Sequence, residues 1–169
     1  MPAKNDSKFV AQVDDKQFYE TARLAGYQLA NSFVRQHMIL SNALKMKPAK
    51  MLVFMTIVTA TVQKFMRQHD FPTELAGTQA LAREHIGYIS RRATAEATGL
   101  PRETVRRAII DLDADGMLVF GPRGSVANKG QILARPEVVE GLRLLTHEAS
   151  ATATKLVNLD ILQFFSAAG

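Results

Sequence analysis

A short stretch of the chain gathers side chains that can form specific hydrogen bonds with nucleic-acid bases. It carries Arg102, Glu103, Arg106 and Arg107. An arginine can pair bidentately with the O6 and N7 atoms of guanine, and a carboxylate can accept a hydrogen bond from the N4 amine of cytosine. These contacts form when the first turns of a helix enter the major groove of DNA. The residue types therefore predict base contacts if one helix presents all four side chains on its exposed face.

The residues around this stretch predict that helix and a second one packed against it. Ser90 is a favourable N-cap for the first helix, and Gly99 can adopt the positive φ that a tight turn requires. Pro101 suits the start of the second helix, which Gly116 ends. Residues 91–115 therefore have the pattern of a helix-turn-helix. The positions expected to face its core are Ala95, Leu100, Val105, Ala108 and Ile109.

The next segment predicts a small β-hairpin, or wing, over residues 117–134. Residues 117–120 and 131–134 have the pattern of two strands, and the loop between them is rich in Gly, Pro, Ser and Asn. A further short strand is expected at residues 88–89. Cations on the wing and at the start of the first helix would contact phosphates, which position the protein on DNA. The expected backbone contacts are Arg91, Arg92, Thr104, Arg123 and Lys129.

The second helix also carries a family resemblance. Its sequence is GLPRETVRR at residues 99–107, followed further on by Gly116-Met117-Leu118. This segment resembles the DNA-contacting part of the bacterial catabolite-activator and fumarate-nitrate-reduction superfamily, with which it shares R-E-T-V-x-R. The resemblance implies base contacts for Arg102, Glu103 and Arg107. It does not imply control by cyclic nucleotides, because the N-terminal part of the chain has a helical pattern instead of a β-roll.

The order of the expected elements is similar to that of the multiple-antibiotic-resistance regulator family. In that family the terminal helices form a dimer. The likeness is one of architecture, since the acidic residue and arginine typical of that family's wing are missing from residues 121–130. Together the two resemblances imply a mainly α fold with a small β wing, a winged helix-turn-helix flanked by N- and C-terminal helices.

The two ends of the chain are expected to support this central part. Residues 1–14 predict a flexible tail, and Asp14 is a candidate N-cap for a long helix over residues 15–47. Residues 135–169 predict C-terminal helices. The DNA-binding domain is expected over residues 48–134.

Within that domain the sequence predicts a core helix and an additional segment. The core helix begins at Pro48 and is apolar nearly all round. Residues 71–87 precede the helix-turn-helix and are expected to include a short helix at residues 78–86, but the pattern assigns no role to this segment.

Apolar stripes on the terminal segments have two interpretations, a monomer core or a core combined with a subunit interface. A winged helix needs only about 70 to 100 residues, which lies at the lower part of the usual domain range. The terminal segments exceed that need, which favours a homodimer. The stripes contain Phe18, Ala25, Leu29 and Phe33 in the N-terminal segment and Leu159, Leu162, Phe164 and Phe165 in the C-terminal one.

The methionines also leave two interpretations open. Flexible Met side chains can line an adaptable pocket for a small-molecule effector, or they can fill irregular spaces in a core. The residues concerned are Met38, Met46, Met51, Met55 and Met66.

Composition narrows the function class further. The net charge of +5 and the pI near 9.7 favour polyanionic partners without identifying one. The absence of cysteine excludes a disulfide framework, a thiolate zinc site and a cysteine nucleophile, and fits a cytoplasmic protein. The most apolar stretch, residues 51–62, is shorter than the roughly 20 residues that span a bilayer, so no membrane partner is expected.

No residue pattern predicts an enzyme, a metal site or a cofactor. The histidines lack ligand spacing, and no nucleophile motif is present. The sequence therefore predicts a cytoplasmic homodimeric transcriptional regulator that binds a palindromic site on double-stranded DNA. The alternative hypothesis is a winged helix that binds proteins in a chromosome-maintenance or replication assembly. The outward-facing arginines favour the first hypothesis.

Overall fold

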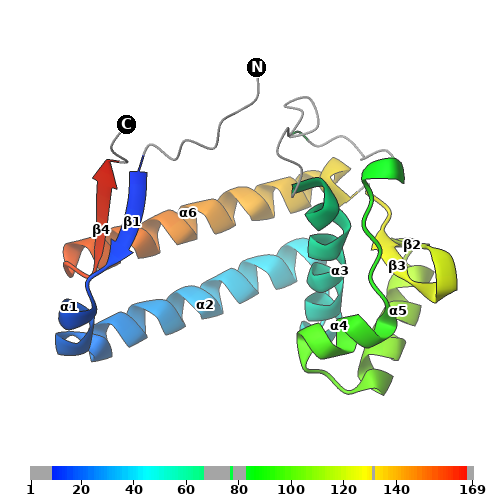
Figure 1. Cartoon of the computed structure of the whole chain (residues 1–169), viewed down its shortest axis with the longest axis horizontal. Coiled ribbons are helices and arrows are strands. Elements are labelled where there is room, and N and C mark those ends of the chain that lie inside the picture. The colour runs from blue at the N-terminus through cyan, green and yellow to red at the C-terminus, as the bar shows by residue number, and fades with distance from the viewer. Residues whose placement is uncertain (1–8, 67–76, 78–82, 131, 167–169) are drawn as a thin grey trace. The chain divides into compact units, whose positions relative to one another are not determined.

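The computed structural model describes residues 9–66, 77, 83–130 and 132–166. Over these residues the fold is mainly helical, with two small antiparallel sheets of two strands each. Figure 1 shows the elements along the chain. They divide into two compact units: a central unit of residues 44–139, and a terminal unit that joins residues 3–43 to residues 140–169.

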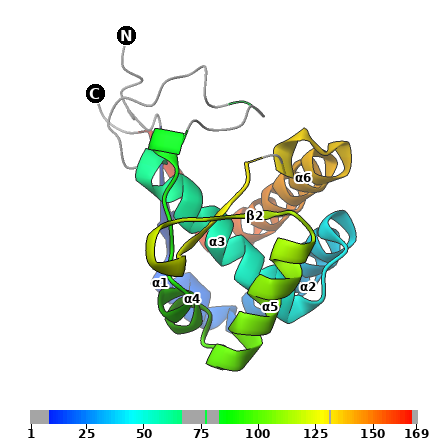
Figure 2. The same ribbon diagram turned by 90° about the vertical axis from the view of Figure 1, so that its right-hand side faces the viewer.

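The central unit is built on α3 (Pro48–Met66), the expected core helix. The side chains of Val53, Phe54 and Ile57 are almost completely buried. Helices α4 (Arg91–Thr98) and α5 (Arg102–Ala114) pack against α3, as Figure 2 shows. The prediction of a central core helix is confirmed.

The predicted capping and turn signals of α4 and α5 are confirmed. The Ser90 hydroxyl accepts a hydrogen bond from the backbone N–H of Ala93 at 3.1 Å, and Gly99 ends α4 with φ of 67°. Gly116, just after α5, has φ of 67° as well. A side chain at either glycine would be strained, because L residues rarely adopt this region. The buried side chains on these helices include Ala95, Val105, Ala108, Ile109 and Leu112.

An antiparallel strand pair follows α5. Strand β2 (Leu118–Phe120) pairs with β3 (Val126–Asn128), and the turn between them contains a 3-10 segment, η3 (Pro122–Gly124). On the other side of β3, Ile89 forms an isolated bridge with Val126, at the short strand expected for residues 88–89.

The expected position of the second wing strand, residues 131–134, was wrong. Residues 132–134 form a 3-10 turn, η4 (Ile132–Ala134), and residue 131 lies outside the described residues. The strand occurs earlier, at residues 126–128, because Val126, Ala127 and Asn128 are buried against the unit's core. Three residues are too few to show the alternation that identifies a strand in a sequence.

Of the segment before α4, the structure describes mainly the end. The short helix expected at residues 78–86 lies largely outside the described residues, and its last part is a single 3-10 turn, η2 (Arg83–His85). Gly87 then passes close to α3, where its N–H donates to the carbonyl of Thr61 at 2.8 Å. A Cβ at Gly87 would clash with the carbonyl oxygen of Ala60.

The terminal unit contains α1 (Asp15–Glu20), most of α2 (Ala22–Leu44) and most of α6 (Pro136–Asn158). The single helix expected over residues 15–47 is interrupted at Thr21. Helices α2 and α6 run antiparallel, since the hydroxyls of Ser32 and Thr152 are 2.7 Å apart and Arg35 pairs with Glu148 at 3.8 Å.

Two predictions for the chain's ends, a flexible tail over residues 1–14 and C-terminal helices over residues 135–169, require correction within the described residues. Residues 1–8 and 167–169 lie outside them. Residues 9–13 form strand β1 (Phe9–Val13), which pairs along its whole length with β4 (Leu162–Ser166). Asp14 caps α1 as expected, because its carboxylate accepts from the N–H of Gln17 at 3.0 Å. The side-chain amide of Gln17 donates to the carbonyl of Leu159 at 3.1 Å, a contact between the N-terminal and C-terminal segments of the terminal unit.

Among the described residues, no helix combines the length and the apolar character needed to cross a membrane.

Candidate nucleic-acid interface

Helix α5 presents its predicted charged residues on one exposed side. Val105, Ala108, Ile109 and Leu112 lie on one side of the helix and are buried, so the side opposite to them faces away from the core. The side chains of Arg102, Glu103, Arg106 and Arg107 are accordingly exposed, whereas Thr104 is half-buried. The first turn of α5 is therefore free to enter a groove that is wide enough for a helix.

Glu103 lies at the centre of an ion network on this side. Its carboxylate accepts hydrogen bonds from Arg106 at 2.7 and 2.8 Å and from Arg107 at 2.9 Å. The hydrogen bonds from Arg106 and then Arg107 lower the pKa of Glu103 from 4.5 to about 2. Both arginines are three or four residues further along the helix, the spacing at which side chains meet. In the free protein Glu103 thus orients two of the predicted base-contacting side chains.

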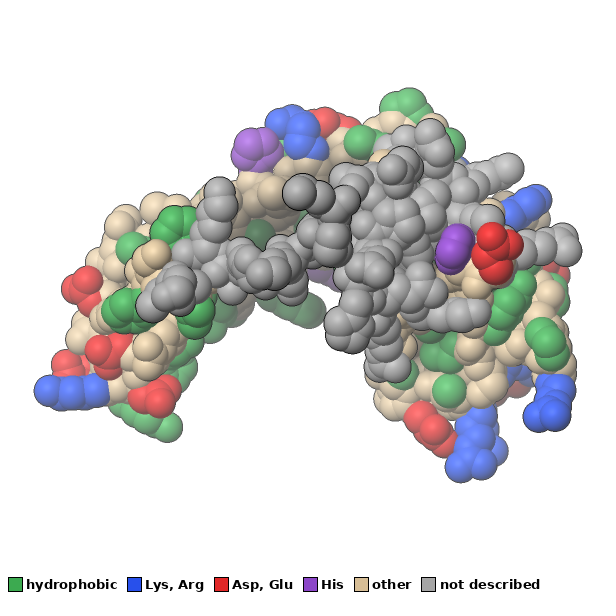
Figure 3. All heavy atoms as spheres, turned by 45° about the horizontal axis from the view of Figure 1, so that its top comes forward, with side chains coloured by type: hydrophobic (Ala, Val, Ile, Leu, Met, Phe, Trp, Pro, Cys, Tyr) green, Lys and Arg blue, Asp and Glu red, His purple; other side chains and the backbone are tan. Residues whose placement is uncertain are grey.

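A hollow of about 220 Å³ lies between the start of α4 and the start of α5. It is lined by Arg91 and Arg92 from α4 and by Arg102 and Arg106 from α5. Four predicted contact residues from two helices therefore converge on one concave surface. Lys and Arg side chains, drawn in blue in Figure 3, project from the part of the surface that carries these helices. Such a concentration of positive charge suits a phosphate group.

One residue of this hollow has a partner that the sequence analysis missed. Arg92 donates a hydrogen bond to Glu96 at 2.7 Å. This bond raises the pKa of Arg92 above its ordinary value. The spacing of four residues between a cation and a carboxylate on one helix is the signal that could have identified the pair.

Arg123 lies at the tip of the β2–β3 turn, in a backbone conformation that is unusual for its residue type. Its φ and ψ are 56° and 28°, and Gly124 follows with φ of 70°. The turn is held by Ser125, whose hydroxyl donates to the carbonyl of Pro122 at 2.8 Å. Left-handed conformations of non-glycine residues cost free energy and concentrate at functional sites. Arg123 is exposed, and it lies at the end of the strand pair where β2 turns back into β3.

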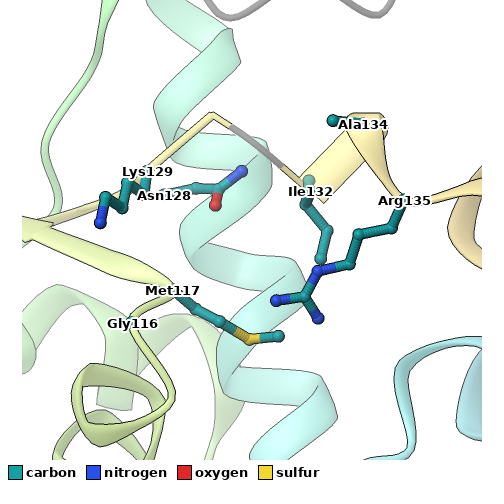
Figure 4. A pocket seen from close by; sticks show the side chains of 7 residues that line it. All are labelled: Gly116, Met117, Asn128, Lys129, Ile132, Ala134 and Arg135. Atoms are coloured by element: carbon teal, nitrogen blue, oxygen red, sulfur yellow. The ribbon is translucent and has the colours of Figure 1, made fainter.

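Lys129 does not share that location. It follows the last residue of β3, and its N–H donates to the carbonyl of Met117 at 3.0 Å, at the base of the strand pair. Its side chain lines a second hollow, shown in Figure 4, together with Arg135. The structure therefore brings Arg91, Arg92, Arg102 and Arg106 together but places Lys129 at the opposite end of β3 from Arg123.

Comparison of the chain with protein-family models, with curated proteins and with solved structures found no match. The two family resemblances inferred from residues 99–118 and from the order of elements remain predictions. The functional assignment of the chain therefore rests on the geometry of its described residues.

Proposed function

We propose that the chain is a cytoplasmic, sequence-specific DNA-binding transcriptional regulator, and that its central unit is a winged helix-turn-helix. The observation that carries the proposal is the convergence of Arg91, Arg92, Arg102 and Arg106 on one hollow beside the exposed start of α5. A recognition helix enters the major groove with its N-terminal residues leading, while the preceding helix crosses the backbone. The proposed arrangement assigns α5 to the first role and α4 to the second.

In this arrangement the arginines of the two helices have different tasks. Arg102 and Arg107 contact base edges, and Arg91 and Arg92 contact phosphates that flank the groove. Arg106 can contact either a base or a phosphate. It lines the hollow together with Arg91 and Arg92, and it lies beside Glu103 on α5. On DNA, the Glu103 carboxylate either keeps its hydrogen bonds with Arg106 and Arg107 or accepts one from a cytosine amine. In both cases Glu103 influences which bases are contacted, so its removal should alter base preference.

Two other predicted contacts fit the same docking. The strand pair β2–β3 is the proposed wing, and Arg123 at its tip contacts the backbone. Thr104, on the turn that carries Glu103, can donate its hydroxyl to a phosphate. Lys129 is not part of the proposed interface, because it lies at the base of the wing.

The terminal unit supports a homodimer. Its large apolar side chains are mostly exposed, including Tyr19, Tyr27, Phe33 and Phe164. The described residues of this unit that are buried are few: Ala25, Ser32, Gly141 and Ile161. Exposed apolar faces of this extent mark interaction sites. A second copy of the chain would cover them by forming a shared helical core, as obligate interfaces do.

The strands β1 and β4 strengthen this argument. An isolated two-stranded sheet is marginally stable in water, and exposed edges without charges favour further association. The paired segments contain no charged residue, and Phe9, Val10, Phe164 and Phe165 are exposed on them. The paired residues Val10 and Phe165 lie on one face, and Ala11 and Phe164 lie on the other. Both faces therefore require a cover.

Selection of bound sequences from random double-stranded DNA tests the function. The proposal predicts enrichment of a two-fold symmetric site whose half-sites are centred about 10 base pairs, or a multiple of that, apart. The double variant Arg102→Ala/Arg107→Ala is the matched control and should lose the enrichment. Absence of any enriched sequence with the folded wild type would overturn the proposal and favour the alternative, a winged helix that binds proteins.

A further inference from the structure

The hollow beside Lys129 has a composition that distinguishes it from the DNA-facing surface. It has a volume of about 360 Å³ and lies within the central unit, between the end of α5, the end of β3 and η4 (Figure 4). Its volume falls at the lower end of the range for small-molecule sites. The lining residues are Gly116, Met117, Asn128, Lys129, Ile132, Ala134 and Arg135.

Both charged residues among the described lining of this hollow are cations. Neither Lys129 nor Arg135 forms an ion pair with a described residue, and no Asp or Glu is among the described residues that line the hollow. The acidic residue next to it in sequence, Asp115, is already paired with Lys50 at 2.6 Å. Figure 4 shows the guanidinium of Arg135 extended into the space between Ile132 and Met117.

Asn128 adds a polar group with unused hydrogen-bonding capacity. The residue is only 6% exposed, and its backbone N–H donates to the hydroxyl of Thr61 at 2.9 Å. Its side-chain amide forms no hydrogen bond with any described residue, and Figure 4 shows it directed into the hollow toward Ile132. Among the described residues no buried side-chain N or O atom lacks a partner, so the Asn128 amide is open to solvent in the hollow. A ligand that replaces this solvent can form hydrogen bonds with the amide.

Apolar side chains form the rest of the lining. Met117 and Ile132 are 8% and 9% exposed, and both have side chains along the hollow. A small-molecule site typically combines such an apolar lining with a few polar groups that fix orientation. Inorganic ions would leave the apolar part of the hollow without a partner.

We propose that this hollow binds a small organic anion, with a carboxylate held by Arg135 and the Asn128 amide and a compact apolar body against Met117 and Ile132. The planar guanidinium matches a carboxylate with two parallel hydrogen bonds. The Asn128 amide donates a further hydrogen bond. The Lys129 ammonium is directed away from Arg135 in Figure 4, so it contributes only longer-range positive potential. This site lies apart from the proposed DNA contacts on α4 and on the first turns of α5.

The test is an NMR titration of the full chain, without DNA, using cyclohexanecarboxylate as the probe. We expect saturable changes at the amides of Gly116, Met117 and Lys129. Loss of a charged hydrogen-bonded partner corresponds to about a tenfold weaker affinity, which is the effect expected for Arg135→Gln. Arg23→Gln, a change of an exposed cation in the terminal unit, should leave the affinity unchanged.

Two further probes separate the parts of the proposal. Cyclohexylmethanol has the apolar body without the charge, and inorganic phosphate has the charge without the body. Both should bind at least tenfold more weakly than cyclohexanecarboxylate. Equal binding of the alcohol, equal binding of phosphate, or unsaturable changes with the carboxylate would each overturn the proposal.

A second variant keeps the proposal testable if Arg135→Gln fails to fold. Asn128→Asp has nearly the same shape but offers Arg135 an internal carboxylate, so it should also weaken binding of the probe. Dispersed amide spectra verify the fold of each variant. Unchanged affinity in both Arg135→Gln and Asn128→Asp would show that the probe binds elsewhere. Because DNA is absent, these results do not depend on the outcome of the DNA selection.

Discussion

The carboxylate of Glu103 binds the guanidinium of Arg106 through two hydrogen bonds, of 2.7 and 2.8 Å, on the exposed side of α5. This bidentate contact holds an arginine in a fixed orientation before any DNA is present. Ordering a long side chain in advance reduces the entropy that binding must otherwise cost. Substitution of Glu103 therefore tests how the charge and the orientation of Arg106 and Arg107 affect binding.

The first prediction concerns the protonation of Glu103. Its pKa in the folded chain is about 2, below the value of 4.5 expected without these contacts. The contact therefore stabilises the fold fully above about pH 4.5, and this contribution is lost as the pH falls through 2. In Arg106→Gln, the titration midpoint of the Glu103 carboxyl carbon, measured by NMR, should move back toward 4.5. Arg143→Gln removes the equivalent contact to Glu140 and should leave Glu103 unchanged.

The second prediction concerns base preference. Arg102→Ala and Arg107→Ala should each lose about 1 to 3 kcal/mol of discrimination at particular positions of the selected site. Glu103→Ala should change base choice more than total affinity, since it releases two arginines while it removes a negative charge. Competition between the selected site and its single-base variants measures both effects. Unaltered specificity in all three variants would exclude α5 as the recognition helix.

The third prediction uses salt dependence to locate phosphate contacts. Removing one contact should weaken binding to all sequences alike and lower the slope of log affinity against log salt by roughly one unit. We expect this for Arg91→Ala, Arg92→Ala and Arg123→Ala. Lys129→Ala, with the same loss of charge at the base of the wing, should keep the wild-type slope. Equal slope changes at Arg123 and Lys129 would contradict the proposed docking.

The fourth prediction concerns the subunit interface. Phe33 is 72% exposed, so Phe33→Glu should disturb little within one chain but place a charge in the proposed apolar interface. Sedimentation should show a dimer for the wild type and a monomer for this variant, with loss of binding to the two-fold symmetric site. Leu52→Glu changes a half-exposed leucine of the central unit and serves as the control. A wild type that is monomeric both free and on DNA would refute the homodimer.

The fifth prediction tests the contact that holds the strand pair β2–β3 against α3. The buried hydroxyl of Thr61 donates to the carbonyl of Ile57 at 2.7 Å and accepts from the N–H of Asn128 at 2.9 Å. Thr61→Val leaves that N–H unpaired and should lower the free energy of unfolding by about 1 to 3 kcal/mol. Thr61→Ser keeps the hydroxyl and should cost less. Urea unfolding monitored by circular dichroism measures the difference.

Local signals in the sequence predicted the helix pair well. Ser90, Gly99 and Gly116 each act within one or two turns of the backbone, so their effect does not depend on the rest of the fold. The exposed charges of α5 followed from the same helix period. The convergence of Arg91 and Arg92 with Arg102 required the angle between two helices, which no local pattern specifies.

The strands that the sequence did not predict depend on contacts with residues far away in the chain. Strand β4 has an apolar sequence that also suits a helix, and it becomes a strand because Leu162–Ser166 pairs with Phe9–Val13 at the other end of the chain. The polar loop composition around residues 121–130 likewise concealed the buried strand β3. The amide of Asn128 gave no signal in the sequence, because its significance depends on the cations that the fold places around the same hollow.

The pairing of β1 with β4 has a consequence for synthesis. The first partner of this sheet leaves the ribosome long before the second, whereas the central unit is formed by one continuous stretch of chain. Domains fold as they emerge, and partly folded chains with exposed apolar surface are prone to aggregate. The segment that contains β1 and α2 therefore leaves the ribosome before β4 and α6, its partners in the terminal unit, have been translated.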